Sequence, residues 1–250
     1  MTRRIKKKET TFSNSFTLVL SRPENPENIG LVARNMKNTG FASLRIVGMD
    51  SLDSRSYSVA VHAQEILEKA QFFDTVAQAT ADLNVVLAST SKRRKNFVLL
   101  TMEEAVSRML AFPPQVKMGL LFGCERTGLT SEELKSANFV FTIPQACCQP
   151  SYNLSSAVLI TLFSLYFQQK PEKKRESAEM PLPRGEQEDC MQRILEKLEA
   201  KGFIHKTNRV HMTERIHGLL GRLHINSKDR ELLLALFSKG VEERKHFPDG

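Results

Sequence analysis

Asn28 and Arg34 are the first two side chains in this sequence whose types and spacing suggest chemistry. An asparagine amide both donates and accepts hydrogen bonds, and an arginine is a permanently charged, fork-shaped donor that suits a phosphate or a sugar edge. Six residues on one helix are separated by roughly 600° of turn, or about 240° net, so the two side chains cannot share one face of a helix interior. With Asn28 in the first turn, it can point toward the edge of a sheet while Arg34 follows later. The structural alternative is that Asn28 helps to cap the helix and Arg34 is solvated.

A second polar segment, residues 122–130, follows an apolar run and places Glu125 between two glycines. Gly123 and Gly128 allow a turn tight enough for a ligand to approach main-chain N–H and C=O groups. Glu125 lies inside this turn and is a candidate either to orient a polar substrate group or to brace the loop. No lysine follows the second glycine, so the segment is not a nucleotide-binding P-loop. The structural alternative is an ordinary turn before a capped helix.

A third segment, Ser151 to Ser155, gathers hydrogen-bonding side chains at the start of an otherwise apolar helix. Exposed N–H groups at a helix N-terminus also point outward there, so the segment can bind a polar or anionic group. The alternative is that Ser151 simply caps the helix.

A fourth segment follows another apolar run, and it combines three small hydroxyl residues with a run of cations. The hydroxyl residues are Ser89, Thr90 and Ser91, and the cations are Lys92, Arg93, Arg94 and Lys95. Four consecutive cations repel one another unless an anion is close, and RNA phosphates would serve. A solvated basic loop is the alternative.

Alternating strands and helices must position these segments. Apolar runs predict strands over residues 16–20, 44–47, 84–88, 118–122 and 139–143. Helical patterns lie between or after them, at about 26–39, 58–70, 101–112, from 130 onward, and 154–167. This alternation predicts an α/β fold with a mostly parallel sheet covered by helices on both faces. The polar segments then gather at the carboxyl edge of the sheet, where such folds bind ligands.

The chain divides into four regions by composition. We expect a basic N-terminal tail over 1–13, the α/β domain over 14–168, a polar linker over 169–186, and a small all-α C-terminal domain over 187–250. Helical patterns in the last region cover about 187–201, 209–223 and 227–244. Its candidate RNA-binding side chains are Arg209, Arg215 and Arg222. A solvated helix face is the alternative.

Composition bounds the partners and the location. The 250 residues carry a formal net charge of +8, which favours a polyanionic partner. No apolar stretch approaches the roughly 18–20 residues that span a bilayer, and the basic N-terminus lacks the apolar run of a secretory signal. We therefore expect a cytoplasmic protein that does not contact membranes. No C-x-x-C or histidine pair completes a zinc site, so no metal is expected.

The three glycine- and asparagine-containing motifs, in this order, resemble those of the SPOUT-class RNA 2′-O-ribose methyltransferases of the TrmH/TrmJ type. That family carries N-x-G-x-x-x-R, F-G-x-E-x-x-G-L and S-x-N-[LV]-[SA] segments. This chain matches them with residues 28–34, 122–129 and 151–155. The likeness covers about residues 14–168. Tyr152 stands where a leucine is common, which affects the expected shape of the adenosyl pocket.

The resemblance implies an α/β sheet whose C-terminal part forms a trefoil knot, a homodimer, and S-adenosyl-L-methionine as the cofactor. It assigns cofactor contacts to eight residues: Ser89, Thr90, Ser91, Gly123, Ile143, Ser151, Tyr152 and Leu154. By the same resemblance Arg34 is placed against the 2′-hydroxyl, with Asn28, Glu125, Ser151 and Asn153 holding it and the ribose. An arginine pKa above about 12 argues for a positioning and charge-stabilising role for Arg34 rather than for a general base.

The helical tail is similar to that of the TrmJ branch, which modifies the anticodon loop of tRNA at the nucleotide numbered thirty-two. The resemblance therefore implies 2′-O-methylation of tRNA. Methylation of ribosomal RNA, and a non-catalytic RNA-binding module on the same fold, are the alternatives.

Overall fold

A computed structural model describes residues 15–91, 97–146, 151–168, 180–205, 207–223 and 225–238. Four parts of the predictions lie outside these residues: the N-terminal tail, the cations Lys92 to Lys95, residues 169–179 of the expected linker, and the end of the last helix.

Seven parallel strands form one sheet in the order β3-β2-β1-β6-β4-β7-β5. The strands are β1 (Phe16–Ser21), β2 (Ser43–Val47), β3 (Gln71–Phe73), β4 (Val85–Ser89), β5 (Leu99–Leu100), β6 (Met118–Phe122) and β7 (Phe139–Phe141). The predicted parallel α/β sheet is confirmed. The two edge strands, β3 and β5, were not expected, because runs of three and two residues are too short to show a strand period.

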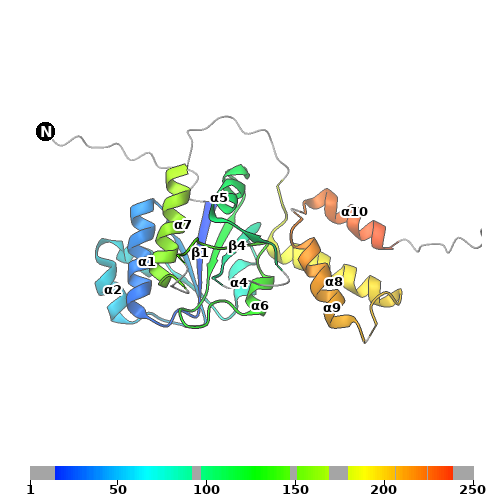
Figure 1. Ribbon diagram of the computed structural model, residues 1–250, viewed down its shortest axis with the longest axis horizontal. Helices are drawn as coiled ribbons and strands as arrows, with labels where there is room; N and C mark the ends of the chain where they lie inside the picture. Colours follow the sequence, from blue (N-terminus) through cyan, green and yellow to red (C-terminus); the bar gives the residue numbers. More distant parts are fainter. Residues whose placement is uncertain are drawn as a thin grey trace, which may run out of the picture.

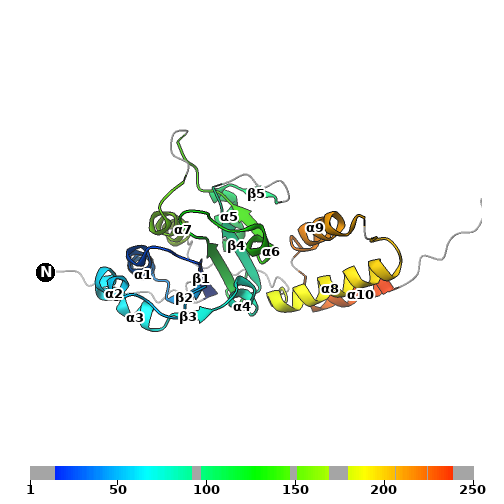
Figure 2. The ribbon, with the colours of Figure 1, turned by 90° about the horizontal axis from the view of Figure 1, so that it is seen from below.

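Helices cover both faces of the sheet (Figures 1 and 2). On one face, α1 (Pro26–Thr39), α5 (Met102–Ala111) and α7 (Leu154–Gln168) bury the larger apolar core. On the other face, α4 (Val76–Thr80) and α6 (Ser131–Lys135) enclose a smaller one. Successive side chains of β1 point to opposite faces of the sheet. Leu18 and Leu20 therefore belong to the larger core, and Val19 belongs to the smaller one.

One expected helix, over 58–70, is wrong in its bounds. The structure has three short pieces instead: α2 (Ser54–Ala60), a 3-10 turn (Val61–Ala63) and α3 (Gln64–Glu68). Val61 follows α2 with a φ of 54°, in the left-handed region that β-branched residues rarely adopt, and the α-helical run ends there.

Helix α1 carries the first motif and is fixed at its start and along its side. The Asn25 side chain caps it by accepting a hydrogen bond from the Glu27 N–H at 2.9 Å, and Pro26 occupies the first turn. Gly30 allows α2 to approach closely, because a Cβ there would lie 2.3 Å from the Ser56 carbonyl oxygen. The first motif therefore sits on a helix whose position is set by backbone contact.

Three more helices follow the α/β part: α8 (Arg184–Ala200), α9 (Arg209–Leu220) and α10 (Ser227–Ser238). They share a third core, which includes Met191, Ile194 and Leu220. Two bounds differ from the expectation. Helix α8 begins at Arg184 rather than at 187, and α9 ends at Leu220, so Arg222 lies beyond it.

The last residues of the expected linker are docked on the sheet domain rather than extended. Leu182 and Arg184 are buried, and the Leu182 and Arg184 N–H groups donate to the Ile225 and Leu83 carbonyls at 2.7 and 2.6 Å. The prediction of a linker is therefore wrong for residues 181–186. A polar, proline-rich composition predicts an extended segment, but it does not show whether the backbone N–H groups of that segment bind to other parts of the fold.

A buried polar cluster, which we call the junction network, joins α8 to the sheet domain. Its members are Asn84, Asn138, Arg184 and Gln187, each no more than 6% exposed. The Gln187 amide donates to the carbonyls of Asn84 and Leu182 at 3.0 and 2.6 Å. It also accepts from Asn138 and Arg184, both at 3.2 Å. Asn138 further donates to the Gly221 carbonyl at 3.1 Å, which ties the end of α9 to β7.

No helix in the described parts of the chain is long and apolar enough to cross a membrane.

Candidate functional site

The carboxyl edge of β4, β6 and β7 opens onto a cavity of about 660 Å³. Its lining includes all eight residues proposed to contact the cofactor: Ser89, Thr90, Ser91, Gly123, Ile143, Ser151, Tyr152 and Leu154. Parallel strands end at the same edge, so segments more than sixty residues apart in the sequence meet there. We call this hollow the edge cavity.

The second motif supplies one wall as a closed turn. The Gly128 N–H donates to the Cys124 carbonyl at 2.8 Å, and Gly128 has a φ of 69°. Gly123 has no room for a side chain, because a Cβ would lie 2.4 Å from the Leu129 nitrogen. The two glycines thus bring main-chain groups, rather than side chains, to the edge of the cavity.

Three side chains from three motifs form one chain of hydrogen bonds, which we call the edge network. The Asn28 amide donates to Glu125 Oε1 at 2.8 Å, and the Asn153 amide donates to Asn28 Oδ1 at 2.9 Å. Asn28 is 4% exposed, so its amide is held by these contacts rather than by water. The structure therefore brings together Asn28, Glu125 and Asn153, as the motif spacing and the parallel sheet predicted.

Glu125 braces the loop that leads into α1. Its two carboxylate oxygens accept from the backbone N–H groups of Glu24 at 2.9 Å and of Asn25 at 3.3 Å, in addition to Asn28. Of the two roles that the sequence left open for Glu125, these contacts favour bracing.

The start of α7 is capped by Asn153 rather than by Ser151. Asn153 Oδ1 accepts from the Ser155 N–H at 2.9 Å and from the Ser155 hydroxyl at 2.7 Å. Ser151 is exposed at the cavity, and its hydroxyl makes no hydrogen bond to any part of the chain that the structure describes. The Tyr152 hydroxyl donates to the Pro144 carbonyl at 2.9 Å, so this unusual residue ties the α7 entry to the loop after β7.

Two residues that the sequence did not single out, Arg22 and Glu133, hold the same turn from outside. Arg22 follows β1 with a φ of 49° and donates to both Glu133 oxygens, at 3.0 and 2.8 Å, and to the Gly128 carbonyl at 3.4 Å. The Ser21 hydroxyl and the Thr130 N–H also donate to Glu133. Thr130 and Glu133 form a capping box at the start of α6, a pattern that a sequence can show, but no local pattern indicates that this glutamate binds an arginine 111 residues away.

These contacts keep Glu133 ionised. Burial alone would raise the pKa of the Glu133 carboxyl, but hydrogen bonds from Arg22, Ser21 and Thr130 outweigh burial and lower the pKa to about 2. Beside it, hydrogen bonds from Cys124 and Arg126 lower the pKa of Glu24. The loops around the cavity are therefore held by ionised carboxylates at neutral pH.

Arg34 does not join the edge network. Its side chain is exposed on α1, about 9 Å along the helix axis from Asn28. Within the described chain it makes no hydrogen bond or ion pair and does not line the edge cavity.

The three arginines of the helical region have different surroundings. Arg209 pairs with Glu199 at 2.7 Å, whereas Arg215 is exposed and Arg222 lines a second cavity. No cluster of three or more potential metal-ligating residues occurs among the residues that the structure describes.

Comparison with known proteins identifies the family of this arrangement. The profile of the SpoU rRNA methylase family matches residues 15–163. The tRNA (cytidine-2′-O-)-methyltransferase TrmJ of Methanocaldococcus jannaschii is 36% identical over 155 residues, which are 60% of this chain and 66% of that protein. The tRNA (cytidine/uridine-2′-O-)-methyltransferase TrmJ of Klebsiella pneumoniae is 26% identical over 91% of this chain and 97% of that protein.

Among solved structures, TrmJ from Z. mobilis superposes with a TM-score of 0.75 at 28% identity. The match covers 89% of this chain and 97% of that one, so it includes both the sheet domain and the helical region.

Proposed function

Because the chain belongs to the SpoU rRNA methylase family, we propose that it methylates a ribose 2′-hydroxyl of tRNA, with S-adenosyl-L-methionine as the methyl donor. The observation that carries the proposal is the edge cavity, whose lining contains all eight residues that the resemblance assigns to the cofactor. The names of the two TrmJ relatives support tRNA as the substrate. We propose the anticodon loop as the target, because the helical tail is similar to that of the TrmJ branch, which modifies this loop.

The edge cavity fits the proposed cofactor in size and in chemistry. About 660 Å³ lies within the range of small-molecule sites, and the closed turn at Gly123 presents main-chain groups that can pair with an adenine edge and ribose hydroxyls. Main-chain atoms of the three loops would bind and orient the cofactor, which when bound supplies an activated methyl group. Ser89, Thr90 and Ser91 would contribute hydroxyl groups from the end of β4.

The other site residues have three proposed roles: they fix the loops, contact the ribose and bind a phosphate. Asn28, Glu125 and Asn153 fix the three loops relative to one another through the edge network. Ser151 lines the cavity, and its hydroxyl has no hydrogen-bond partner among the described residues, so it is the group that we propose to contact the ribose. Arg34 would bind the neighbouring phosphate and stabilise negative charge on the reacting oxygen.

Arg34 and the edge cavity come together most simply in a homodimer. Helix α7 exposes Leu159, Phe163, Tyr166 and Phe167, which are 39–77% exposed and follow helical spacing along one stripe. An apolar stripe of this kind fits a second copy of the same surface. Helix α1, which carries Arg34, packs beside α7 through the Asn35 amide and the Ser155 carbonyl at 2.9 Å. We propose that Arg34 acts at the cavity of the partner subunit.

Mixed dimers test this arrangement. Arg34→Ala subunits and Gly123→Val subunits, which cannot form the turn, are each expected to be inactive alone. Mixed together after dissociation, they are expected to recover part of the activity, because one of the two sites then has both components. If Arg34→Ala and Gly123→Val subunits show no activity after mixing, this result would contradict a shared site. In a separate test of the dimer, Phe163→Asp should give monomers, as measured by light scattering.

The trefoil knot and a cytoplasmic location stay predictions that accompany this proposal. Ribosomal RNA is the second candidate substrate, because the family is described as one of rRNA methylases.

The direct test is methyl transfer from labelled S-adenosyl-L-methionine to unmodified tRNA and, separately, to ribosomal RNA, followed by nuclease mapping. Label at a ribose of the anticodon loop is the expected result. Label only in ribosomal RNA would show that ribosomal RNA, rather than tRNA, is the substrate, while the proposed methyl transfer would stand. No label, together with no cofactor binding by calorimetry, would contradict the proposal and favour an RNA-binding module.

A further inference from the structure

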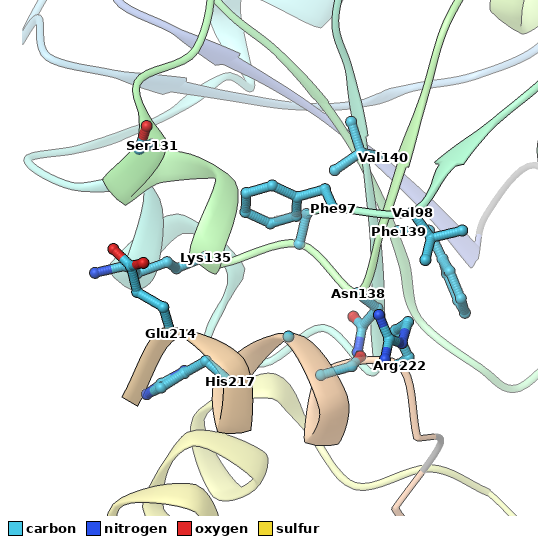
Figure 3. A pocket seen from close by; sticks show the side chains of 13 residues that line it. Phe97, Val98, Ser131, Lys135, Asn138, Phe139, Val140, Glu214, His217 and Arg222 are labelled. Atoms are coloured by element: carbon cyan, nitrogen blue, oxygen red, sulfur yellow. The ribbon is translucent and has the colours of Figure 1, made fainter. Parts of the chain in front are cut away.

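A second cavity, of about 330 Å³, lies between the sheet domain and the end of α9 (Figure 3), and it shares no lining residue with the edge cavity. Phe97 and Val98 contribute apolar surface beside the edge strand β5, and His217 and Arg222 lie on the opposite side, on or after α9. We call it the junction cavity. The cofactor proposal does not use it.

The frame of this cavity is rigid. Asn138 lines it and donates to the Gly221 carbonyl at 3.1 Å, while its own Oδ1 accepts from the Val86 N–H at 2.9 Å. Gln187 and Arg184 brace Asn138 from behind, within the junction network. The space between α9 and the sheet is thus set by buried hydrogen bonds rather than by loose packing.

The lining combines an aromatic ring with the side chains of Arg222 and His217. Phe97 is only partly buried where it packs on the smaller core, so part of the side chain is accessible. Arg222 is exposed and forms no ion pair within the described residues. His217 Nδ1 is the single buried side-chain nitrogen or oxygen in the described chain without a hydrogen-bond partner. This nitrogen is covered by protein atoms, and the other ring nitrogen, Nε2, lies 3.6 Å from a Glu188 carboxylate oxygen. The groups of the lining that we expect a ligand to contact are therefore Phe97 and Arg222.

A partly accessible aromatic ring and an arginine guanidinium in the lining of one cavity suit an unstacked nucleobase. Bases splayed out of single-stranded RNA stack on aromatic side chains and on arginine planes, and they hydrogen-bond through their edges. The chain's net charge of +8 and the run of cations that ends at Lys95, two residues before Phe97, favour a polyanion such as RNA over an apolar protein surface.

The position of the cavity relates it to the proposed methylation site. Leu129 lines the edge cavity, and two residues later Ser131, the first residue of α6, lines the junction cavity together with Lys135 at the end of that helix. The segment that begins at Ser91 in the first cavity also ends at Phe97 in the second. A single RNA strand can therefore reach both.

We propose that the junction cavity binds an unstacked base of the RNA substrate that flanks the methylated nucleotide, with Phe97 as the stacking platform. This rests on the proposed function for the identity of the RNA, but the binding itself requires no methyl transfer.

The absence of tryptophan from the sequence allows a direct test. Phe97→Trp places one tryptophan in the cavity, and Phe73→Trp places one at β3, on the opposite edge of the sheet. On titration of the full-length chain with unmodified tRNA, emission from Phe97→Trp should be quenched as the base stacks, and emission from Phe73→Trp should stay nearly constant. Equal signals from both variants, or none from Phe97→Trp while filter binding shows a complex, would overturn the proposal.

A second pair of variants guards against a folding artefact. Phe97→Leu keeps an apolar side chain for the core but removes the ring, and it should raise Kd for tRNA at least about fivefold, because one stacked base is lost. Phe97→Tyr should restore binding, and the affinity for S-adenosyl-L-methionine should be unchanged in both. An unchanged Kd in Phe97→Leu would overturn the proposal.

The two proposals fail in distinguishable ways. If tRNA quenches Phe97→Trp but the wild-type chain transfers no methyl group, the junction cavity stands and the proposed function falls. If methyl transfer proceeds and Phe97→Leu binds tRNA normally, the proposed function stands and the junction cavity does not bind a base.

Discussion

The edge network and the junction network use the same kinds of side chain for different ends. At the edge, Asn28 is buried, but Glu125 is half-buried and Asn153 is exposed, so the network ends at solvent and at a cavity. At the junction, all four members are at most 6% exposed and bond to one another and to backbone N–H and carbonyl groups, and Arg184 also contacts the Glu188 carboxylate at 3.5 Å.

The difference separates positioning from assembly. A buried network that is fully satisfied fixes one arrangement of the chain, and removing one member leaves its partners without bonds. A network that opens onto a cavity fixes loops whose remaining surface is free for a ligand. We therefore expect substitutions at the junction to lower stability, and substitutions around the edge network to lower activity.

Arg34→Ala should have the largest effect of all, and on activity alone. Arg34 belongs to neither network and makes no protein contact in the described chain, so the free energy of unfolding should hardly change. Loss of a charge that positions substrate should lower the methyl-transfer rate by about a hundredfold or more. Single-turnover transfer, thermal melting and calorimetric cofactor binding measure the three quantities.

Arg34→Lys is the matched control, because it keeps the charge and loses the fork. It should stay well below wild type if bidentate contact matters. An Arg34→Ala enzyme with normal turnover would remove Arg34 from the site.

Gln187→Ala should show the opposite pattern. The substitution leaves the carbonyls of Asn84 and Leu182, and the donors of Asn138 and Arg184, without their shared partner. A loss of about 2–4 kcal/mol in the free energy of unfolding is expected. Cofactor affinity of the folded protein should be unchanged, since Gln187 does not line the edge cavity. Urea denaturation and calorimetry make the comparison.

Asp189→Ala serves as the control, because Asp189 is exposed on the same helix and makes no hydrogen bond or ion pair within the described residues. If Gln187→Ala left stability unchanged while abolishing cofactor binding, the division between the two networks would be wrong.

The sequence predicts the edge better than the junction for a physical reason. Parallel strands end on one side, so polar motifs that follow separate strands must meet, and Asn28 reaches Glu125 and Asn153 across 97 and 125 residues. The order and spacing of the motifs then supply the ligand chemistry through the family resemblance. That route depends on patterns that stand out from ordinary surface residues.

The junction offers no such pattern. In the sequence, Asn84 begins a predicted strand, Gln187 begins a predicted helix, and Arg184 belongs to the predicted polar linker. Their burial depends on where α8 docks, and no local periodicity encodes that placement. The same holds for Arg22 and Glu133, whose contact depends on the strand order β1-β6 rather than on either local sequence.

Glu133→Gln should sharpen the comparison through pH. The folded pKa of about 2 lies below the unfolded value of about 4.3, so the carboxylate stabilises the fold above that value. This contribution is lost as pH falls from about 4.3 toward 2. Glu133→Gln should therefore melt at a lower temperature than wild type at pH 7, and the two melting curves should converge as pH approaches 2.

Thermal melting across pH 2–7 is the measurement, with Glu132→Gln as the exposed neighbour for comparison. A constant difference between wild type and Glu133→Gln at every pH would mean that the hydrogen bonds to Arg22 and Thr130 do not depend on the charge.

Arg215→Ala should have the smallest effect, and only on RNA binding. Arg215 is exposed and unpaired in the described chain, so an RNA phosphate can bind it without displacing a carboxylate. Arg209 already pairs with Glu199 at 2.7 Å, and binding a phosphate there would break that ion pair. In plots of log affinity for tRNA against log salt concentration, Arg215→Ala should reduce the slope by about one, and Arg209→Ala by less. Neither arginine belongs to a buried network, so both variants should have the melting temperature of wild type. A larger slope change from Arg209→Ala than from Arg215→Ala would show that RNA replaces Glu199 as the partner of Arg209.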